Sequence, residues 1–471
     1  AQLARLRRSP ADVRVFEDRP LALAGEPGKP SAVPALVGAD QMHAANITGK
    51  GVGVAFIDTG LFDTVGTMTD SQDTFRVRAA YDAVRNLYSL DAVLDENGHG
   101  SHVVSVTASS NYSLAGGGSR RYNGVAPDAR LIVVKAFDDN GWGSYANVIR
   151  GIDWVVANRE EYGIRVLNCS FGAPPRSHYW QDPLNQAIMR AWQAGIVVVA
   201  SSGNTGPGAQ TIRVPGNVPY VITVGAFTDN YTPDNSSDDR LTSFSSAGPT
   251  YDRFVKPEVV APGGHVLGLM DKKSILPREH KQYVDRENAK YFTMSGTSQS
   301  AAVVTGVVAL LLQAQPQLTP DDVKCRLLSS ARGAINPQDQ RAYSIFQQGA
   351  GMVWTPDAVA GTAVGCANVG LNVGNDLSGE QHFAGRARQL ADGSFVVDGL
   401  TADGTVWDGV LQPGGGVFLQ GDPWTDIAVG LAGDPWTDTF MWPTGYPWEE
   451  THLWSPGLSE TMSINVWVQQ Q

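Results

Sequence analysis

The chain has 471 residues, 42% hydrophobic and 17% charged, which is typical of a soluble globular protein with two or three domains. Its net charge is −12, and the segment from Cys366 onward, with 13 acidic and two basic residues, carries −11 of it. This acidic balance argues against nucleic acid, whose affinity depends on basic side chains facing phosphates. No window reaches eighteen consecutive apolar residues, so we expect no membrane span. The N-terminal residues lack the apolar core of a signal peptide, so we expect none in this chain.

The three cysteines contain no C-x-x-C pair, so neither a zinc site nor a disulfide framework is indicated. At most one disulfide can form, and the redox compartment stays open at this point. Fifty-two glycines and 27 prolines favour a fold with many tight turns.

Residues 51 to about 312 alternate short apolar runs with helical patterns. Turn residues bound β-branched runs that predict buried strands at 51–58, 129–137, 164–171, 195–203 and 219–226. Apolar positions at helical spacing, with a glycine at the end of each stretch, predict helices within 145–163 and 183–195. Strands separated by helices indicate an α/β fold with a parallel sheet covered on both faces. In such sheets, ligands bind outside the carboxyl ends of the strands.

Four polar residues follow strands or precede a long apolar helix. Asp58 ends the first strand in IDTG, His99 lies in the glycine-rich NGHGSH, Asn204 ends SSGN, and Ser298 lies in SGTS. Each residue alone has an ordinary alternative: a turn aspartate, a surface histidine, a turn asparagine or a helix N-cap serine. Together they are the groups of a serine hydrolase, in which a histidine takes the proton of the attacking serine.

At these motifs the chain resembles the subtilisin family of serine peptidases over about residues 36 to 362. The charged insertion at 265–292 is similar to that of the AprX-like branch. The resemblance implies a three-layer α/β fold with a central parallel sheet. The small β-rich C-terminal domain that we expect after it is predicted from the repeats described below, not from the resemblance. The resemblance also implies a serine endopeptidase in which Asp58 orients His99, His99 activates Ser298, and Asn204 stabilises the oxyanion of the path to an acyl-enzyme.

The resemblance further implies how a peptide substrate binds. The substrate would lie as an added antiparallel strand, with main-chain hydrogen bonds giving affinity and side-chain pockets giving preference. The residues implied are Gly141, Trp142, Gly143, Ser170, Phe171, Gly172, Ala200, Ser201, Ser202 and Gly203. Arg213 falls where the family has a small residue at the base of the S1 pocket. It would select acidic P1 side chains, unless it points to solvent or pairs structurally.

Two departures from the family pattern follow the serine. Gln299 stands where the family has methionine, and Ala302 stands where the family has proline at the first turn of the helix. Neither change removes a proton-transfer group. His102, in the same GHGSH motif, is interpreted as structural.

The ends of the chain have their own patterns. We expect residues 1–30 to be a remnant of an inhibitory propeptide or an ordinary extension, 31–362 to be the peptidase domain, and 363–471 to be the acidic accessory domain. Tryptophans 424, 436 and 448 and glycines 409, 421, 433, 445 and 457 recur every twelve residues, which predicts stacked β units. Their Trp layer would be a domain core, bind a polymer, or hold the tail against the peptidase domain.

The chemistry needs no cofactor, and the metal ligands are unknown. Structural calcium could bind the aspartate pairs 422/426 and 434/438, although solvated acidic residues explain them too. We expect a secreted or periplasmic monomer acting on proteins or peptides, with its own propeptide as a partner. The alternative is a non-catalytic binding protein that uses the Trp-rich region for adhesion.

Overall fold

The computed structural model describes residues 31–114, 119–336 and 341–398, together with 407, 417–418, 440–441, 461–464, 467–468 and 470. The possible propeptide and most of the twelve-residue repeats therefore lie outside the described residues.

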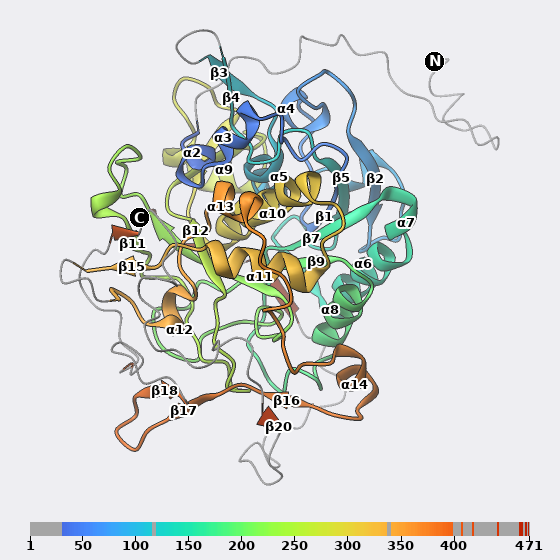
Figure 1. The fold of residues 1–471 in the computed structure, drawn as a ribbon. Helices are drawn as coiled ribbons and strands as arrows, with labels where there is room; N and C mark the ends of the chain where they lie inside the picture. The colour runs from blue at the N-terminus through green and yellow to red at the C-terminus, as the bar shows by residue number, and fades with distance from the viewer. Residues whose placement is uncertain are drawn as a thin grey trace, which may run out of the picture.

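The centre of the molecule is an eight-stranded sheet (Figure 1). Its strand order is β11-β10-β9-β7-β1-β5-β2, with β12 paired to β10, and only β11 runs antiparallel to its neighbour. The strands are β1 (Gly53–Asp58), β2 (Val77–Asp82), β5 (Arg130–Lys135), β7 (Ile164–Cys169), β9 (Val197–Ser201), β10 (Ile222–Thr228), β11 (Arg240–Leu241) and β12 (Val259–Pro262). All five predicted strands are present in this sheet. The predicted α/β fold with a parallel sheet is confirmed.

The apolar runs become strands because both faces of the sheet are covered. Every residue of β1 and of β9 is buried, which explains why these strands are mainly continuous apolar runs rather than alternating apolar and polar residues. Helices α6 (Tyr145–Ala157) and α8 (Pro183–Gln193) pack together against one face, beside β1 and β9. Helices α5 (His99–Ala108) and α10 (Thr297–Ala314) pack together against the other (Figure 1).

The helices begin where the sequence supplies capping groups. Asp182 accepts hydrogen bonds from the amides of Leu184 and Asn185 at the start of α8, and Pro183 occupies its first turn. Helix α10 is apolar all round and passes through the core. It is long and apolar enough to cross a bilayer, but 89% of it is buried inside the protein.

Shorter elements surround this core. The other helices are α2 (Val33–Leu36), α3 (Ala39–Ala44), α4 (Val65–Met68), α7 (Arg159–Tyr162), α9 (Ile275–Glu279), α11 (Pro320–Ser330), α12 (Ile345–Gln348), α13 (Thr355–Ala360) and α14 (Val373–Ser378), with 3₁₀ turns η1 (Leu90–Val93), η2 (Ser236–Asp238) and η3 (Lys281–Tyr283). The small sheets pair β3 (Tyr112–Leu114) with β4 (Arg120–Tyr122), β13 (Val266–Leu269) with β14 (Tyr291–Met294), β15 (Ala334–Ile335) with β19 (Val417–Phe418), β16 (Phe383–Ala384) with β20 (Phe440–Met441), and β17 (Ala387–Gln389) with β18 (Phe395–Val397). A three-stranded sheet joins β6 (Trp142–Ser144), β21 (Thr461–Ile464) and β8 (Phe171–Gly172).

The described residues after 362 pack against the peptidase core. Cys325 and Cys366 form a disulfide, so the one bridge that the sequence allowed is present, and Cys169 is free and buried. The hydroxyl groups of Tyr179 and Tyr220 donate to the buried carboxylate of Asp376 on α14. The boundary at residue 363, and a separate accessory domain beyond it, stay predictions.

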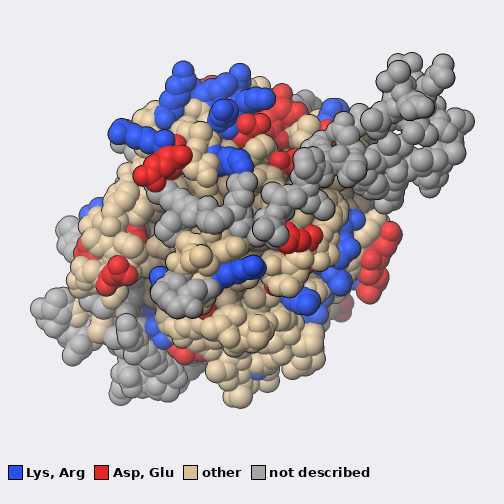
Figure 2. All heavy atoms as spheres, turned by 90° about the horizontal axis from the view of Figure 1, so that it is seen from above, with Lys and Arg blue, Asp and Glu red and all other residues tan. Residues whose placement is uncertain are grey.

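Both basic and acidic side chains occur on the described part of the face in Figure 2, between larger areas of other residues. At the upper edge of this view several basic side chains lie close together, with acidic side chains beside them.

Candidate active site

Asp58 and His99 meet at the carboxyl end of β1. Asp58 is the last residue of β1, His99 is the first residue of α5, and His99 Nδ1 lies 2.7 Å from Asp58 Oδ1. Both side chains are buried. The approach of these two elements requires glycine, because a Cβ on Gly100 would lie 2.4 Å from the carbonyl oxygen of Gly60. The pair has the geometry of a carboxylate that fixes the tautomer and orientation of an imidazole.

Ser298 is the second residue of α10 and contacts Ser170, the residue that follows β7. Its Oγ donates to the carbonyl oxygen of Ser170 at 3.2 Å, and the Ser170 hydroxyl donates to the Ser298 carbonyl oxygen at 3.0 Å. These reciprocal bonds tie the start of α10 to residue 170, one of the predicted substrate-binding residues. Ser298 therefore occupies the positive N-terminal end of a buried helix, where developing negative charge is stabilised.

The amide of Asn204 has a fixed orientation. Its Oδ1 accepts hydrogen bonds from the backbone N–H and the hydroxyl of Thr297, at 2.9 and 2.8 Å. Two donors on one atom identify that atom as oxygen, so the Nδ2 donor projects from the other side of the amide. The structure thus places a side-chain donor beside the turn that carries Ser298.

Asp95 clamps the loop that leads into α5, a contact that the sequence analysis missed. Its Oδ1 accepts from Thr59 Oγ1 at 2.8 Å and from the Gly98 amide at 2.7 Å, and its Oδ2 accepts from the amide and hydroxyl of Ser101 at 2.7 and 2.6 Å. Thr59 follows Asp58, and Gly98 precedes His99, so one buried carboxylate links the two segments that carry the pair. The only sequence signal was an acidic residue four positions before His99.

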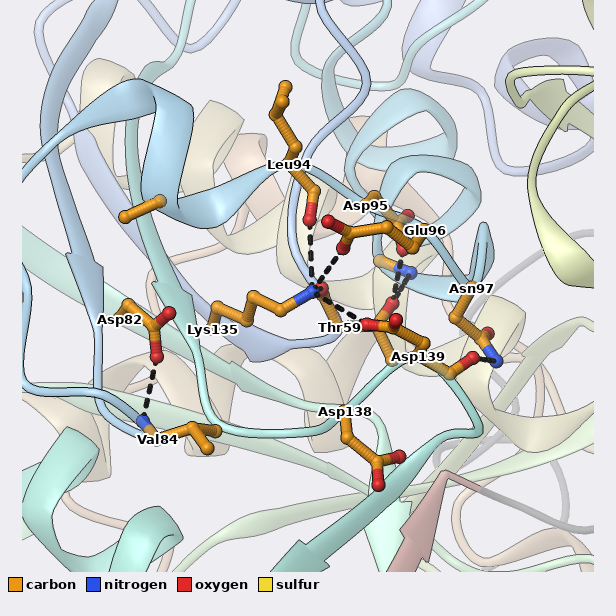
Figure 3. Close-up of polar contacts among 12 residues, drawn as sticks. Thr59, Asp82, Val84, Leu94, Asp95, Glu96, Asn97, Lys135, Asp138 and Asp139 are labelled. Carbon is orange, nitrogen blue, oxygen red and sulfur yellow. Dashed lines mark hydrogen bonds and ion pairs between the residues drawn. The ribbon is translucent and has the colours of Figure 1, made fainter.

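Lys135 holds the same loop from the neighbouring strand (Figure 3). Its Nζ donates to the carbonyl oxygens of Thr59 and Leu94, each at 2.9 Å, and forms an ion pair with Glu96 at 2.6 Å. Because Lys135 pairs in register with Asp58, the end of β5 supports the end of β1.

His102 lies one turn after His99 on α5 and is fully buried. Its Nε2 donates to the backbone carbonyls of Val266 and Phe292, and its Nδ1 accepts a long hydrogen bond of 3.4 Å from the side-chain amide of Gln299. Burial, with a smaller effect of His99, lowers the pKa of His102 to about 3, so this imidazole is neutral. These contacts agree with the structural interpretation of His102. They also place Gln299 in the core, fully buried.

The predicted substrate-binding residues form two facing edges. Gly141, Trp142 and Gly143 lie on or beside β6, and Phe171 and Gly172 form β8. Ala200 and Ser201 end β9, with Ser202 and Gly203 directly after them. The edges are not open, because β21 pairs with β6 on one side and with β8 on the other, antiparallel to both.

Arg213 lies beneath this site. A Cβ on Gly172 would be 2.9 Å from Arg213 Cβ, and a Cβ on Gly203 would be 2.5 Å from Arg213 Cγ. The aliphatic part of Arg213 therefore packs between the predicted S1 walls. Its Nε donates to Thr205 Oγ1 at 3.3 Å, and burial lowers the pKa of its guanidinium.

Among the described residues, no group of three or more His, Cys, Asp or Glu side chains is placed to hold a metal ion. The aspartate pairs 422/426 and 434/438 lie outside the described residues, so calcium stays a prediction there.

Comparison with known proteins matches the described geometry to one family. A model of the Subtilase family matches residues 49–351. Serine protease AprX of Bacillus subtilis is 38% identical over 327 residues, 68% of each chain, and Subtilisin DY of Bacillus licheniformis is 32% identical over 304 residues, 64% of this chain and 91% of that protein. The crystal structure of fervidolysin from Fervidobacterium pennivorans, described as a keratinolytic enzyme related to subtilisin, superposes with a TM-score of 0.55 at 27% identity. It covers 71% of this chain and 46% of that one.

Proposed function

The chain belongs to the subtilase family and is a subtilisin-like serine endopeptidase, and we propose that Asp58, His99 and Ser298 form its catalytic triad. Ser298 Oγ attacks the scissile carbonyl while His99 takes its proton, which gives a tetrahedral intermediate. His99 returns that proton to the amine as the C–N bond breaks and the acyl-enzyme forms, and water then hydrolyses the acyl-enzyme. Asp58 holds the imidazole in the tautomer that can accept from Ser298 and stabilises the imidazolium. The observation that carries this assignment is the buried 2.7 Å contact between Asp58 and His99.

The direct test is the variant Ser298→Ala, assayed on casein and with a fluorophosphonate probe. We expect the probe to label the wild-type chain at Ser298 and leave the variant unlabelled, with a loss of turnover of about 10⁶-fold, the figure known for subtilisin. Labelling of the variant, or casein hydrolysis at the wild-type rate, would contradict the triad. A chain that folds but never reacts with the probe would favour the non-catalytic alternative for this particular protein.

The oxyanion site is proposed to consist of the Asn204 side-chain amide and the Ser298 backbone N–H. The fixed amide orientation supports this role, since both Thr297 donors bond the oxygen and the Nδ2 donor therefore lies on the opposite side of the amide. Asn204→Ala should lower kcat by about 10²- to 10³-fold with little change in KM, as removal of this type of donor does in subtilisin. Asn204→Asp, which removes the donor while keeping the size, is the matched variant.

Substrates are proteins, and we propose that they bind by strand addition between β6 and β8. The supporting observation is that both edges accept an antiparallel strand in this structure. Arg213 would contribute its charge to the base of S1, because its stem already lies between Gly172 and Gly203.

We further propose that the enzyme is secreted or periplasmic and acts as a monomer. The Cys325–Cys366 disulfide supports an oxidising compartment. A propeptide in residues 1–30 would be tested by N-terminal sequencing of wild type and Ser298→Ala. The same N-terminus in both would reject self-processing.

A further inference from the structure

The strand between β6 and β8 is part of the same chain. β21 spans Thr461–Ile464, and it pairs Met462 with Gly143, Ser463 with both Trp142 and Gly172, and Ile464 with Phe171. The Ile464 amide donates to the carbonyl oxygen of Gly141 at 3.2 Å. The strands that pair with β21 on both of its edges thus lie about 300 positions earlier in the chain.

The position of β21 relative to Ser298 follows from its register. Ile464 lies opposite Phe171, and the residue before Phe171 is Ser170, whose carbonyl oxygen is 3.2 Å from Ser298 Oγ. In an antiparallel pair the strand runs on toward residue 170, so β21 is directed along the groove to the nucleophile. A substrate strand bound in the manner proposed above would take the same place and the same direction.

Side chains of β21 and of the described residues after it hold this segment in place. Met462 is fully buried in the main core, and Ile464 packs on Gly141, where its Cδ1 would lie 2.6 Å from an added Cβ. Farther on, the Trp467 ring stacks on His280 at 3.9 Å between centroids, in the insertion before Ser298. Gln470 accepts from the Ser295 hydroxyl at 2.7 Å and donates to the Thr293 carbonyl oxygen at 3.2 Å.

The burial of the reacting groups agrees with an occupied groove. Ser298 is 1% exposed and His99 is 2% exposed. A substrate strand would need the place that β21 occupies between β6 and β8, so β21 must leave before the substrate enters.

We propose that β21, with Trp467 and Gln470 after it, is an intramolecular ligand of the substrate groove, which holds the peptidase in an occluded state. The inference rests on the proposed function, because it takes the site between β6 and β8 as the substrate groove. The sequence of β21 also predicts which peptides the groove prefers. Side chains at alternate positions of a strand share one face, and the two on one face of β21, Met462 and Ile464, are both apolar. The groove therefore favours peptides with apolar residues at these two positions.

The first experiment measures binding rather than catalysis. A fluorescein-labelled peptide of residues 459–471 is titrated into Ser298→Ala, which cannot cut it, in the full chain and in a chain ending at Leu458. A tethered ligand competes at an effective concentration of about millimolar, so the full chain should bind the peptide about 10- to 100-fold more weakly. Equal affinity of the two chains would overturn the proposal, and so would binding of a scrambled peptide as tight as that of the true one.

A pair of point variants tests the same idea without truncation. Ile464→Pro removes the amide that donates to Gly141 and should restore peptide binding to the level of the shortened chain. Ser463→Ala keeps every backbone amide of β21 and should remain occluded. If Ile464→Pro stays as occluded as Ser463→Ala, the strand is not what blocks the groove.

Activity then separates this inference from the proposed function. With Ser298 intact, Ile464→Pro should lower KM for a peptide substrate by about the factor by which it strengthens peptide binding, and kcat should not change. One outcome would reject the catalytic assignment alone: no chain hydrolyses the substrate or reacts with a fluorophosphonate, while the peptide titrations give the expected result. The proposal that β21 occupies the groove would then still hold. Hydrolysis by the full chain with the same KM as the shortened chain would reject the occupancy alone.

Discussion

Asp95 lies outside the proposed triad, yet the structure gives it a measurable effect on turnover. Its four hydrogen bonds join Thr59, Gly98 and Ser101, so it fixes the loop that delivers His99 to Asp58. The informative change is Asp95→Asn, which keeps the shape of the side chain. It replaces one acceptor oxygen by an NH₂ group that faces existing donors.

The expected loss of stability in Asp95→Asn follows from the hydrogen bonds that each carboxylate oxygen accepts. Each oxygen accepts one backbone N–H, from Gly98 or from Ser101, and one hydroxyl. A hydroxyl can turn away but a backbone N–H cannot, so either orientation of the amide leaves one buried N–H without an acceptor. An unsatisfied buried donor costs about 1–3 kcal/mol, and the remaining bonds lose their charge assistance, so we expect a loss of about 3 kcal/mol of unfolding free energy. A shift of His99 by about 1 Å would lower kcat by up to about 10²-fold.

The assay is thermal unfolding together with kcat and KM on a small chromogenic peptide. Asp153→Asn is the matched control, because Asp153 is half exposed on α6 and pairs with Arg190 at the surface. That change should alter the unfolding free energy by less than about 1 kcal/mol. A further readout is the pH profile of kcat/KM, whose acidic limb should move in Asp95→Asn if the environment of His99 changes. Wild-type kcat and an unmoved profile in a destabilised Asp95→Asn would show that the clamp serves stability alone.

Three more expectations follow from the same structure. If Arg213 supplies the base of S1, peptides with Glu or Asp at P1 should be preferred over Phe or Leu, and Arg213→Gly should reverse the order; an unchanged P1 profile would show that the charge points away. Gln299 cannot form a sulfoxide and Met294, the nearest methionine in the sequence, is buried, so activity should survive peroxide and Gln299→Met should become sensitive. Rapid loss of wild-type activity with Met294 oxidised would contradict this. The pKa of His102 is about 3 in the folded chain and about 6.5 in the unfolded chain. As the pH falls from 6.5 toward 3, only the unfolded chain gains this proton, so the free energy of unfolding drops by about 1.4 kcal/mol per pH unit. Denaturant titrations from pH 7 to 4 should show a shallower decline in His102→Gln, and parallel curves would refute the assignment.

The central sheet could be predicted because its signal is local. The runs GVAFID in β1 and VVVAS in β9 are apolar up to their last residue, and the turn residues around them mark their ends within a residue or two. The motifs of Asp58, His99, Asn204 and Ser298, and their order along the chain, could also be recognised from the sequence. The family and the enzyme class that they suggested are confirmed. The individual roles of the four residues stay predictions.

The contacts that sequence could not reveal are those between distant segments. The partners of Asp95 include Thr59, 36 positions earlier, and nothing in the local pattern distinguishes this aspartate from a turn former. β21 is four residues long, and its place in a sheet depends on two edges near residues 142 and 171. A strand of that length has no periodicity of its own, so only the folded chain shows where it lies.

The disulfide between Cys325 and Cys366 affects how long such an enzyme survives its own activity. A peptidase in solution digests any copy whose segments open, so its lifetime depends on local opening more than on complete unfolding. The bridge closes a loop of 41 residues, which by chain entropy is worth about 4 kcal/mol, and it joins α11 to the segment that carries Asp376. The segment 366–376 is therefore held at one end by the disulfide and at the other by the hydrogen bonds of Tyr179 and Tyr220 to Asp376. Mild reduction should therefore shorten the half-life of a concentrated solution, with the first cuts near this segment, before any change in the initial rate of hydrolysis.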